Sequence, residues 1–312
     1  MTVLLWIGVL VGSSILSLAS VAMSIQVADK FGQHDHPDGS RKLQIQPIPK
    51  LGGIALALSF SVASFLLLWL LGFSNTSVRA AMVLIPALLA AVVGYVDDAR
   101  NIQPIPRLLL QSSIGGLAWI MGTRIGITGI FWLDALLTIA WFMVLINGIN
   151  LLDNSDGLAA TTVLVSSLGA TAIAAMFGQT LFTLLGLALA GTCLGYLWHN
   201  WYPARVYMGD SGAYFLGVML ASLIIGLQPQ TFPPPVAVAI ALLLAALPIV
   251  DTTFVVVRRL RHGIHPFTAG RDHLAHLLQD RGTTVVNSVI TLQVGLLLAV
   301  SLAVGLAAVQ YR

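Results

Sequence analysis

Ten long runs of apolar residues divide this 312-residue chain, and they constrain its fold more than any other feature. A helix needs about 17–25 mostly apolar residues to cross the hydrocarbon core of a bilayer. The runs occupy residues 3–25, 51–73, 80–96, 108–122, 130–147, 158–177, 179–197, 212–227, 235–257 and 286–310. Only 9% of the residues are charged and 57% are hydrophobic, which excludes a soluble globular protein or a disordered chain. The sequence predicts an all-α polytopic membrane protein with about ten transmembrane helices.

The runs are predicted to belong to one domain. No soluble domain, trusted repeat or low-complexity tract separates them, so residues 1–312 are expected to form a single integral membrane domain. The first run has no basic segment before it and is longer than the apolar core of a signal peptide, so we expect it to be retained. The single cysteine, Cys193, lies in an apolar run and excludes a disulfide scaffold.

Basic residues predict which side of the membrane each loop faces. Loops 26–50, 97–107, 148–157, 198–211 and 258–285 together hold twelve Lys and Arg residues, and the other loops with the C-terminus hold three. Because short loops rich in Lys and Arg face the cytoplasm, both termini are predicted to lie outside. All seven histidines and ten of the twelve acidic residues, which are all aspartates, follow the basic side. This asymmetry predicts a polar reaction centre at the cytoplasmic face.

Carboxylates stand at two predicted helix ends. Asp97 and Asp98 are adjacent after the third run, which suits divalent-metal binding or proton abstraction near a metal. Asp210 opens the eighth run within Gly-Asp-Ser-Gly, where it could be a metal ligand beside phosphate-binding backbone N–H groups or a plain helix N-cap. A solvated helix end is the competing interpretation of the Asp97–Asp98 pair, and neither motif decides alone.

The densest polar cluster ends the fifth run. It contains Asn147, Asn150, Asp153, Asn154 and Asp156. On a helix, residues three apart lie near one face, which groups the first three of these. Their side-chain oxygens suit Mg²⁺, and amides also suit a uracil edge or a ribose. Five such side chains beside a membrane are costly without partners, so the cluster predicts a binding site.

A histidine-containing segment lies in the longest predicted cytoplasmic loop. Arg271, His273 and His276 are too far along the chain to be the basic flank of the ninth run. A guanidinium group with two imidazoles suits a diphosphate. A zinc site is less favoured, because the only cysteine lies within a span.

The first predicted cytoplasmic loop ends in Pro47-Ile-Pro-Lys-Leu-Gly-Gly53. Its prolines stiffen the chain, and its two glycines permit close approach of a helix or substrate. Arg41, Lys42 and Lys50 suit an anionic lipid headgroup, although ordinary lipid-facing basic residues would give the same pattern.

With five motifs in this order, the chain resembles the polyprenyl-phosphate N-acetylhexosamine-1-phosphate transferases, which are glycosyltransferases of family 4. The resemblance covers nearly the whole chain. Residues 248–252, followed by Arg258 and Arg259, resemble the GlcNAc-1-phosphate branch rather than the distant phospho-MurNAc-pentapeptide translocase. The resemblance implies ten or eleven membrane helices, a cytoplasmic active site, and Mg²⁺ as cofactor with Mn²⁺ as a substitute.

The activity implied is transfer of sugar-1-phosphate from a UDP-sugar, with UDP-GlcNAc as the expected donor, to undecaprenyl or another polyprenyl phosphate, with release of UMP. This reaction is the first membrane step of cell-envelope glycan pathways such as those of lipopolysaccharide and teichoic acid. The implied location is the bacterial inner membrane, where membrane lipids surround the protein. Family members often form homodimers, and no nucleic acid partner is expected.

The resemblance also implies roles for individual residues. Asp97 and Asp98 match the pair that handles the lipid phosphate, and Asn150 and Asp210 match metal-binding positions. The remaining matches are substrate-binding positions: Lys50, Asn147, Asp153, Asp156, Arg271, His273 and His276. Asp97, Asp98 and Asp210 are the expected catalytic residues, and Asp251 is expected to have a structural or supporting role.

The chain departs from many relatives at Asn154, where glycine is common, at Ala275, where a further histidine is common, and near Gln44 and Gln46, where a basic residue is common. Two other classes of function also stay open. A nucleotide-sugar or anion transporter would place polar residues through the midplane. Another phosphotransferase could use a different donor, such as UDP-MurNAc-pentapeptide; a CDP-alcohol enzyme is disfavoured, because Thr161 stands where its motif has arginine.

Overall fold

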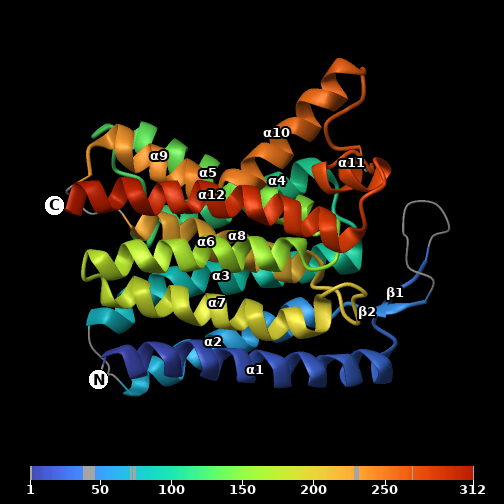
Figure 1. Cartoon of the computed structure of the whole chain (residues 1–312), viewed down its shortest axis with the longest axis horizontal. Coiled ribbons are helices and arrows are strands. Elements are labelled where there is room, and N and C mark those ends of the chain that lie inside the picture. The colour runs from blue at the N-terminus through green and yellow to red at the C-terminus, as the bar shows by residue number, and fades with distance from the viewer. Residues whose placement is uncertain are drawn as a thin grey trace.

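The computed structural model describes residues 2–37, 46–70, 72, 75–227, 232–268 and 270–311. These residues form a bundle of long helices that lie side by side, with one short hairpin at one end (Figure 1). The elements are α1 (Thr2–Phe31), β1 (His34–Asp35), β2 (Ile48–Pro49), α2 (Gly52–Leu70), α3 (Asn75–Arg100), α4 (Pro104–Ile120), α5 (Phe131–Leu152), α6 (Leu158–Met176), α7 (Thr180–Asn200), α8 (Gly209–Gly226), α9 (Pro234–Leu244), α10 (Ala246–Arg261), α11 (Leu274–Asp280) and α12 (Val285–Tyr311).

The all-α, multi-span prediction is confirmed. Eight helices of the described residues are long and apolar enough to cross a membrane, and α9 with α10 makes up to nine. Helix α4, with 17 residues, covers the fourth predicted span and is at the short limit for a crossing. Helix α1 begins and α12 ends at the end of the bundle opposite β1 and β2 (Figure 1). The count of ten spans and the placement of both termini outside stay predictions.

The ninth predicted span, residues 235–257, is wrong as a continuous helix. It breaks at Ala245 into α9 and α10, which are bent by 76° relative to each other. Pro248 explains the break, because it has no N–H to donate to the carbonyl of residue 244 and its ring crowds that carbonyl. Pro248 instead packs on α5 at Gly148, where a Cβ would lie only 2.9 Å from the proline Cβ. The break directs α10 away from the bundle (Figure 1).

Helix α8 is the central element of the fold. Its residues 211–225 are all buried, and it packs against α2, α3, α5 and α6. Such a helix is apolar on every side, as expected for a span enclosed by other helices. Its first turn carries Asp210, so the central helix begins at the predicted reaction centre.

Two glycines allow neighbouring helices to approach the start of α8. A Cβ on Gly94 of α3 would overlap the backbone of Asp210, and a Cβ on Gly53 of α2 would overlap Met208 and Gly212. Only glycine lets backbones come this close. The predicted close approach at Gly53 is therefore confirmed, with helix α8 as its partner.

Candidate active site

The last turn of α3 meets the first turn of α8. Asp97 and Asp98 lie on α3 and Asp210 lies on α8, and Gly94 makes this contact possible. The end of α5 joins them, because the Asn150 Nδ2 group donates a hydrogen bond of 2.5 Å to Asp210 Oδ1. Three segments far apart in the sequence thus bring polar side chains together, as the motifs predicted.

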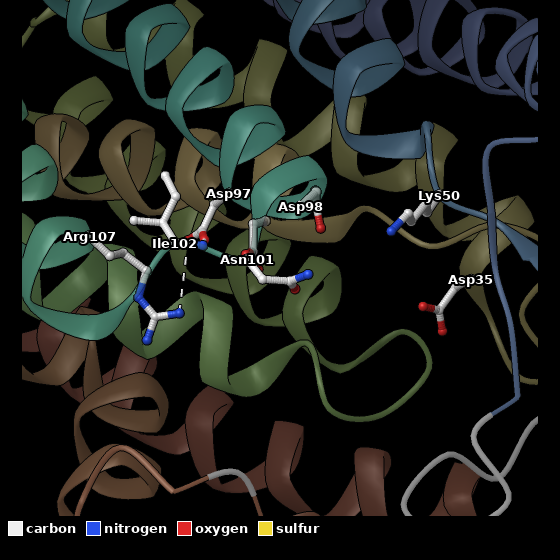
Figure 2. A pocket seen from close by; sticks show the side chains of 8 residues that line it. Asp35, Lys50, Asp97, Asp98, Asn101, Ile102 and Arg107 are labelled. Carbon is white, nitrogen blue, oxygen red and sulfur yellow. Dashed lines mark hydrogen bonds and ion pairs between the residues drawn. The ribbon is translucent and has the colours of Figure 1, made fainter.

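A cleft of about 310 Å³ opens beside these helix ends (Figure 2). It is lined by Asp35, Lys50, Asp97, Asp98, Asn101, Ile102, Arg107 and Asp210. Four aspartates face one lysine and one arginine in this lining, so its formal charge is negative. Of the predicted site residues, the cleft itself contains Lys50, Asp97, Asp98 and Asp210.

The two adjacent aspartates have different surroundings. Asp97 is buried, and its oxygens accept hydrogen bonds from Tyr214 Oη at 2.6 Å and from the Ile102 N–H at 2.9 Å. Arg107 Nη1 lies 3.8 Å from the same carboxylate. Asp98 is only half-buried and faces the start of α8, where its Oδ2 lies 3.4 Å from the Ser211 nitrogen. Asp97 therefore anchors the helix end, and Asp98 is the one available to a ligand.

Lys50 is positioned by backbone pairing. Strands β1 and β2 form an antiparallel pair, and the Lys50 N–H donates to Gln33 O at 3.2 Å. On the other side, the N–H of Tyr207 donates to Pro49 O at 2.8 Å, three residues before Asp210. The Lys50 side chain points across the cleft toward Asp98 (Figure 2). Arg41 and Lys42, the other predicted lipid-binding residues, lie outside the described part of the chain.

Asp153 lies where the negative charges are concentrated. Burial raises its pKa well above the ordinary value of 3.8, and the carboxylates of Asp210, Asp156 and Asp98 raise it further. Burial also raises the pKa of Asp156, although the Ala204 N–H donates to its Oδ2 at 2.8 Å. Carboxylates crowded in this way need a proton or a cation to offset their repulsion.

Sequence comparison identifies the family. The model of glycosyl transferase family 4 matches residues 80–228, which include both α3 aspartates, the α5 cluster and Asp210. The chain is 30% identical over 296 residues to the decaprenyl-phosphate N-acetylglucosaminephosphotransferase of Mycolicibacterium smegmatis, covering 82% of this chain and 71% of that protein. The chain belongs to glycosyl transferase family 4.

Two further relatives show the range of this family. A probable undecaprenyl-phosphate N-acetylglucosaminyl 1-phosphate transferase of Bacillus subtilis is 28% identical over 290 residues, 88% of this chain and 78% of that protein. A phospho-N-acetylmuramoyl-pentapeptide-transferase of Streptococcus pneumoniae is 31% identical over 236 residues, 69% of this chain and 72% of that protein. Family 4 thus includes relatives named for two kinds of sugar donor.

The cleft of this family 4 protein suits a divalent cation completed by a ligand. Within the described ranges, no three His, Cys, Asp or Glu side chains converge closely enough to hold an ion by themselves. Mg²⁺ is commonly held by one or two carboxylates, with water and substrate phosphates completing its shell. Asp210 offers one such carboxylate, and a half-turn of the Asn150 amide would present an amide oxygen as a second ligand. The excess of aspartates at this end of the bundle favours the same ion.

The remaining predicted residues of the α5 cluster have partners within the protein. Asn147 Nδ2 donates to Gln111 Oε1 at 2.6 Å and to Met143 O at 2.8 Å, which leaves its Oδ1 for a ligand. Asn154 donates to Leu151 O at 2.5 Å. These bonds fix the polar side chains at the end of α5 before any substrate binds.

The histidine segment forms a separate group. His273 and His276 are buried, with ring centroids 5.8 Å apart, and Arg271 is half-buried. The segment is joined to the α5 cluster through Gln279 of α11, whose Nε2 lies 3.4 Å from Ser155 Oγ. Among the described residues, no hydrogen bond or ion pair links Arg271, His273 or His276 to Asp97, Asp98 or Asp210. Burial lowers the pKa of His276, and Arg271 lowers it further, so its neutral form is favoured.

Several residues of the site were not predicted as site residues, among them Asp35, Asn101 and Ile102 of the cleft lining. Arg107 was counted only among the cytoplasmic basic residues, yet it lines the cleft from α4. Gln111 stands one turn further along α4 and bonds Asn147, and Tyr214 holds Asp97 from α8. For Gln111 and Tyr214 the available signal was a single polar residue within an apolar run, because such residues in a membrane helix are expected to have partners.

Proposed function

We propose that this protein transfers GlcNAc-1-phosphate from UDP-GlcNAc to a polyprenyl phosphate and releases UMP, with Mg²⁺ as cofactor. The observation that carries the proposal is the cleft in which Asp98 of α3 and Asp210 of α8 meet Lys50 and Arg107. The names of the relatives with GlcNAc-phosphate activity support the sugar and the acceptor. Their bacterial sources support a location in the bacterial inner membrane.

The reaction requires one bond to form and one to break. An oxygen of the lipid phosphate forms a bond to the β-phosphorus of the UDP-sugar. The bond between that phosphorus and the oxygen bridging to the α-phosphorus breaks, and UMP leaves with the bridging oxygen. Phosphoryl transfer of this kind depends chiefly on alignment and charge neutralisation, which Lys50 and Arg107 can supply to an anionic acceptor.

The residues are assigned roles from their positions. Asn150 and Asp210 would hold Mg²⁺, which would neutralise charge on the diphosphate. Asp153, Asp156 and Asn147 orient the nucleoside. Arg271, His273 and His276 contact the diphosphate or the sugar; the bond from Gln279 of the neighbouring helix α11 to Ser155, which brings this segment to the end of α5, supports that assignment.

Asp98 is assigned to the reacting lipid phosphate. It is half-buried in the cleft, and its position between Lys50 and the start of α8 would let it orient the attacking phosphate or take a proton from it. Asp97 holds this end of α3 in place, because its carboxylate accepts hydrogen bonds from Tyr214 and Ile102.

Replacing Arg107 by glutamine is expected to weaken acceptor binding selectively. The KM for polyprenyl phosphate should rise about tenfold or more, because a charged hydrogen bond to phosphate is lost, while the KM for UDP-GlcNAc stays the same. Arg100→Gln is the matched control, since Arg100 is exposed at the end of α3 and does not line the cleft. An equal rise in both KM values would contradict the assignment of Arg107 to the acceptor.

The raised pKa of Asp153 predicts how Mg²⁺ stabilises the protein. A carboxyl group whose pKa is higher in the folded state binds more protons when folded, so metal-free stability should fall as pH rises above about 4 through the raised value. Mg²⁺ should offset this repulsion and therefore raise Tm more at pH 8 than at pH 5. Thermal unfolding in detergent, with Mg²⁺ or EDTA, measures both values. The difference should shrink in Asp153→Asn; an equal Mg²⁺ effect at both pH values would refute this prediction.

UMP release by the purified protein tests the proposed function. Separate reactions contain polyprenyl phosphate, Mg²⁺ and one of UDP-GlcNAc, UDP-GalNAc, UDP-glucose or UDP-MurNAc-pentapeptide. We expect UMP only with UDP-GlcNAc, and only when lipid and metal are both present. UMP release with UDP-MurNAc-pentapeptide would contradict the proposed donor and show that the protein uses the donor of the pentapeptide transferases. Transport of a nucleotide sugar into vesicles without UMP release would show that the protein is a transporter and would contradict the proposed transferase activity.

A further inference from the structure

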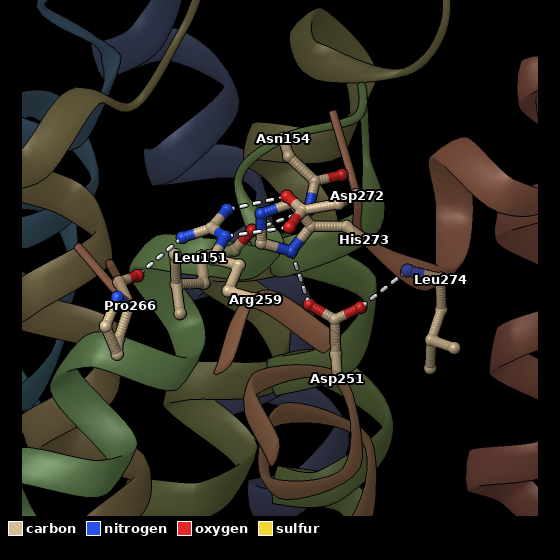
Figure 3. Close-up of polar contacts among 8 residues, drawn as sticks. All are labelled: Leu151, Asn154, Asp251, Arg259, Pro266, Asp272, His273 and Leu274. Carbon is tan, nitrogen blue, oxygen red and sulfur yellow. Dashed lines mark hydrogen bonds and ion pairs between the residues drawn. The ribbon is translucent and has the colours of Figure 1, made fainter. Parts of the chain in front are cut away.

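An aspartate of α10 holds the first histidine of the histidine segment. Asp251 is 1% exposed and His273 is 4% exposed. Asp251 Oδ2 lies 2.7 Å from His273 Nδ1, and Asp251 Oδ1 accepts the Leu274 N–H at 2.8 Å (Figure 3). Both oxygens of one buried carboxylate are thus used by two successive residues of the segment.

This contact determines which nitrogen of the His273 ring carries the proton. An ionised carboxylate only accepts hydrogen bonds, so His273 Nδ1 carries the proton and Nε2 is left for another partner. The bond also fixes the ring orientation and stabilises positive charge on the ring when Nε2 binds an anionic oxygen. Burying a carboxylate within an apolar helix costs free energy unless the carboxylate has partners, and His273 and Leu274 are those partners.

A second contact holds the same segment to α10. The guanidinium of Arg259 donates two hydrogen bonds to Asp272, at 2.6 and 2.7 Å, and a third to Pro266 O at 2.7 Å (Figure 3). Asp272 directly precedes His273, and its pKa is lowered by the bonds from Arg259. The backbone on both sides of the ring is therefore fixed, so the ring can be oriented accurately.

We propose that Asp251 is a positioning residue that holds His273 with its Nε2 directed to the diphosphate of the sugar donor. This inference rests on the proposed function, because that function supplies the diphosphate. It assigns Asp251 a task in the reaction beyond holding the histidine segment against α10. The bend at Ala245 also gains a function, since it brings Asp251 and Arg259 of α10 to the histidine segment.

A double-mutant cycle in the full-length protein tests the coupling. Asp251→Asn keeps the size of the side chain but lets its amide donate to Nδ1, which forces the proton onto Nε2. We expect kcat/KM for UDP-GlcNAc to fall at least about 10–100-fold, the range found when the partner that orients a functional histidine is lost. In a His273→Gln background the same substitution should cause little further loss. Equal losses in both backgrounds, or no loss in the single variant, would overturn the proposal.

The control is the neighbouring position on the same helix. Thr252 has a buried hydroxyl without a hydrogen-bond partner among the described residues, so Thr252→Val preserves shape and removes no contact. We expect it to leave kcat/KM unchanged. A loss equal to that of Asp251→Asn would show that any change in α10 disturbs activity, and would overturn the positioning role.

Nitrogen NMR of histidine-labelled protein tests the inference without using activity. The His273 signal, identified by its loss in His273→Gln, should show a proton on Nδ1 in the wild-type protein. A proton on Nε2 alone would contradict the proposal even if every variant folds. If wild-type protein releases no UMP while Nδ1 is protonated, the proposed function has failed and the Asp251–His273 pair has not.

Discussion

Asp210→Asn is expected to lower kcat for UMP release by about two to three orders of magnitude, because it removes a negative charge from the proposed Mg²⁺ position. Asp210 lies on the first turn of the central helix and is bonded by Asn150 at 2.5 Å. Asparagine keeps the shape and can still bond Asn150, so the fold should be retained. Initial rates at several Mg²⁺ concentrations, with Tm measured in parallel, give the comparison.

The control for this variant is Asp29→Asn, which makes the same chemical change outside the cleft. Asp29 is 60% exposed and pairs with His34 at 2.9 Å, so its loss should cost little. We expect Asp29→Asn to retain the wild-type rate and Mg²⁺ dependence. If Asp210→Asn kept the wild-type rate and Mg²⁺ dependence as well, Asp210 would have no part in Mg²⁺ binding or in the reaction; it is not the N-cap of α8, since Met208 holds that position.

Asp98→Asn and Asp97→Asn should separate chemistry from structure within one pair. Asp98→Asn is expected to lower kcat at least about a hundredfold, with UDP-GlcNAc binding unchanged, because Asp98 faces the cleft and the proposed acceptor. Asp97→Asn should chiefly lower Tm, since Tyr214 and Ile102 both donate to this buried carboxylate and an asparagine cannot accept from both in the same way. Turnover, donor binding and thermal unfolding are measured for both variants. Normal donor binding and full turnover in Asp98→Asn would contradict a catalytic role for Asp98.

The helical segments could be predicted because membrane spans depend mainly on composition. Each of the ten apolar runs coincides with a helix or with the α9–α10 pair. The break at Pro248 could not be predicted from proline alone, because Pro86 lies inside α3, which continues as one helix. The difference lies in packing, since Pro248 fits against Gly148 of another helix. Local sequence does not contain that contact.

The convergence of the acidic motifs was also predicted, and α3, α5 and α8 do meet. The division of labour between Asp97 and Asp98 was not predicted, because it depends on Tyr214, which lies 117 positions away in the chain. Arg107 was missed for the same reason, since a single arginine at the start of a helix looks like an ordinary cytoplasmic charge. The supporting role expected of Asp251 agrees with its bonds to His273 and Leu274.

The fate of the β-phosphorus tests the central claim most directly. UDP-GlcNAc labelled with ³²P at the β-phosphate is incubated with the protein, polyprenyl phosphate and Mg²⁺, and the lipid and aqueous phases are separated. We predict that the label enters the lipid together with the sugar and that the released UMP is unlabelled. Label that stays in the aqueous phase while sugar enters the lipid would show transfer of the sugar alone, and would contradict phosphosugar transfer by this protein.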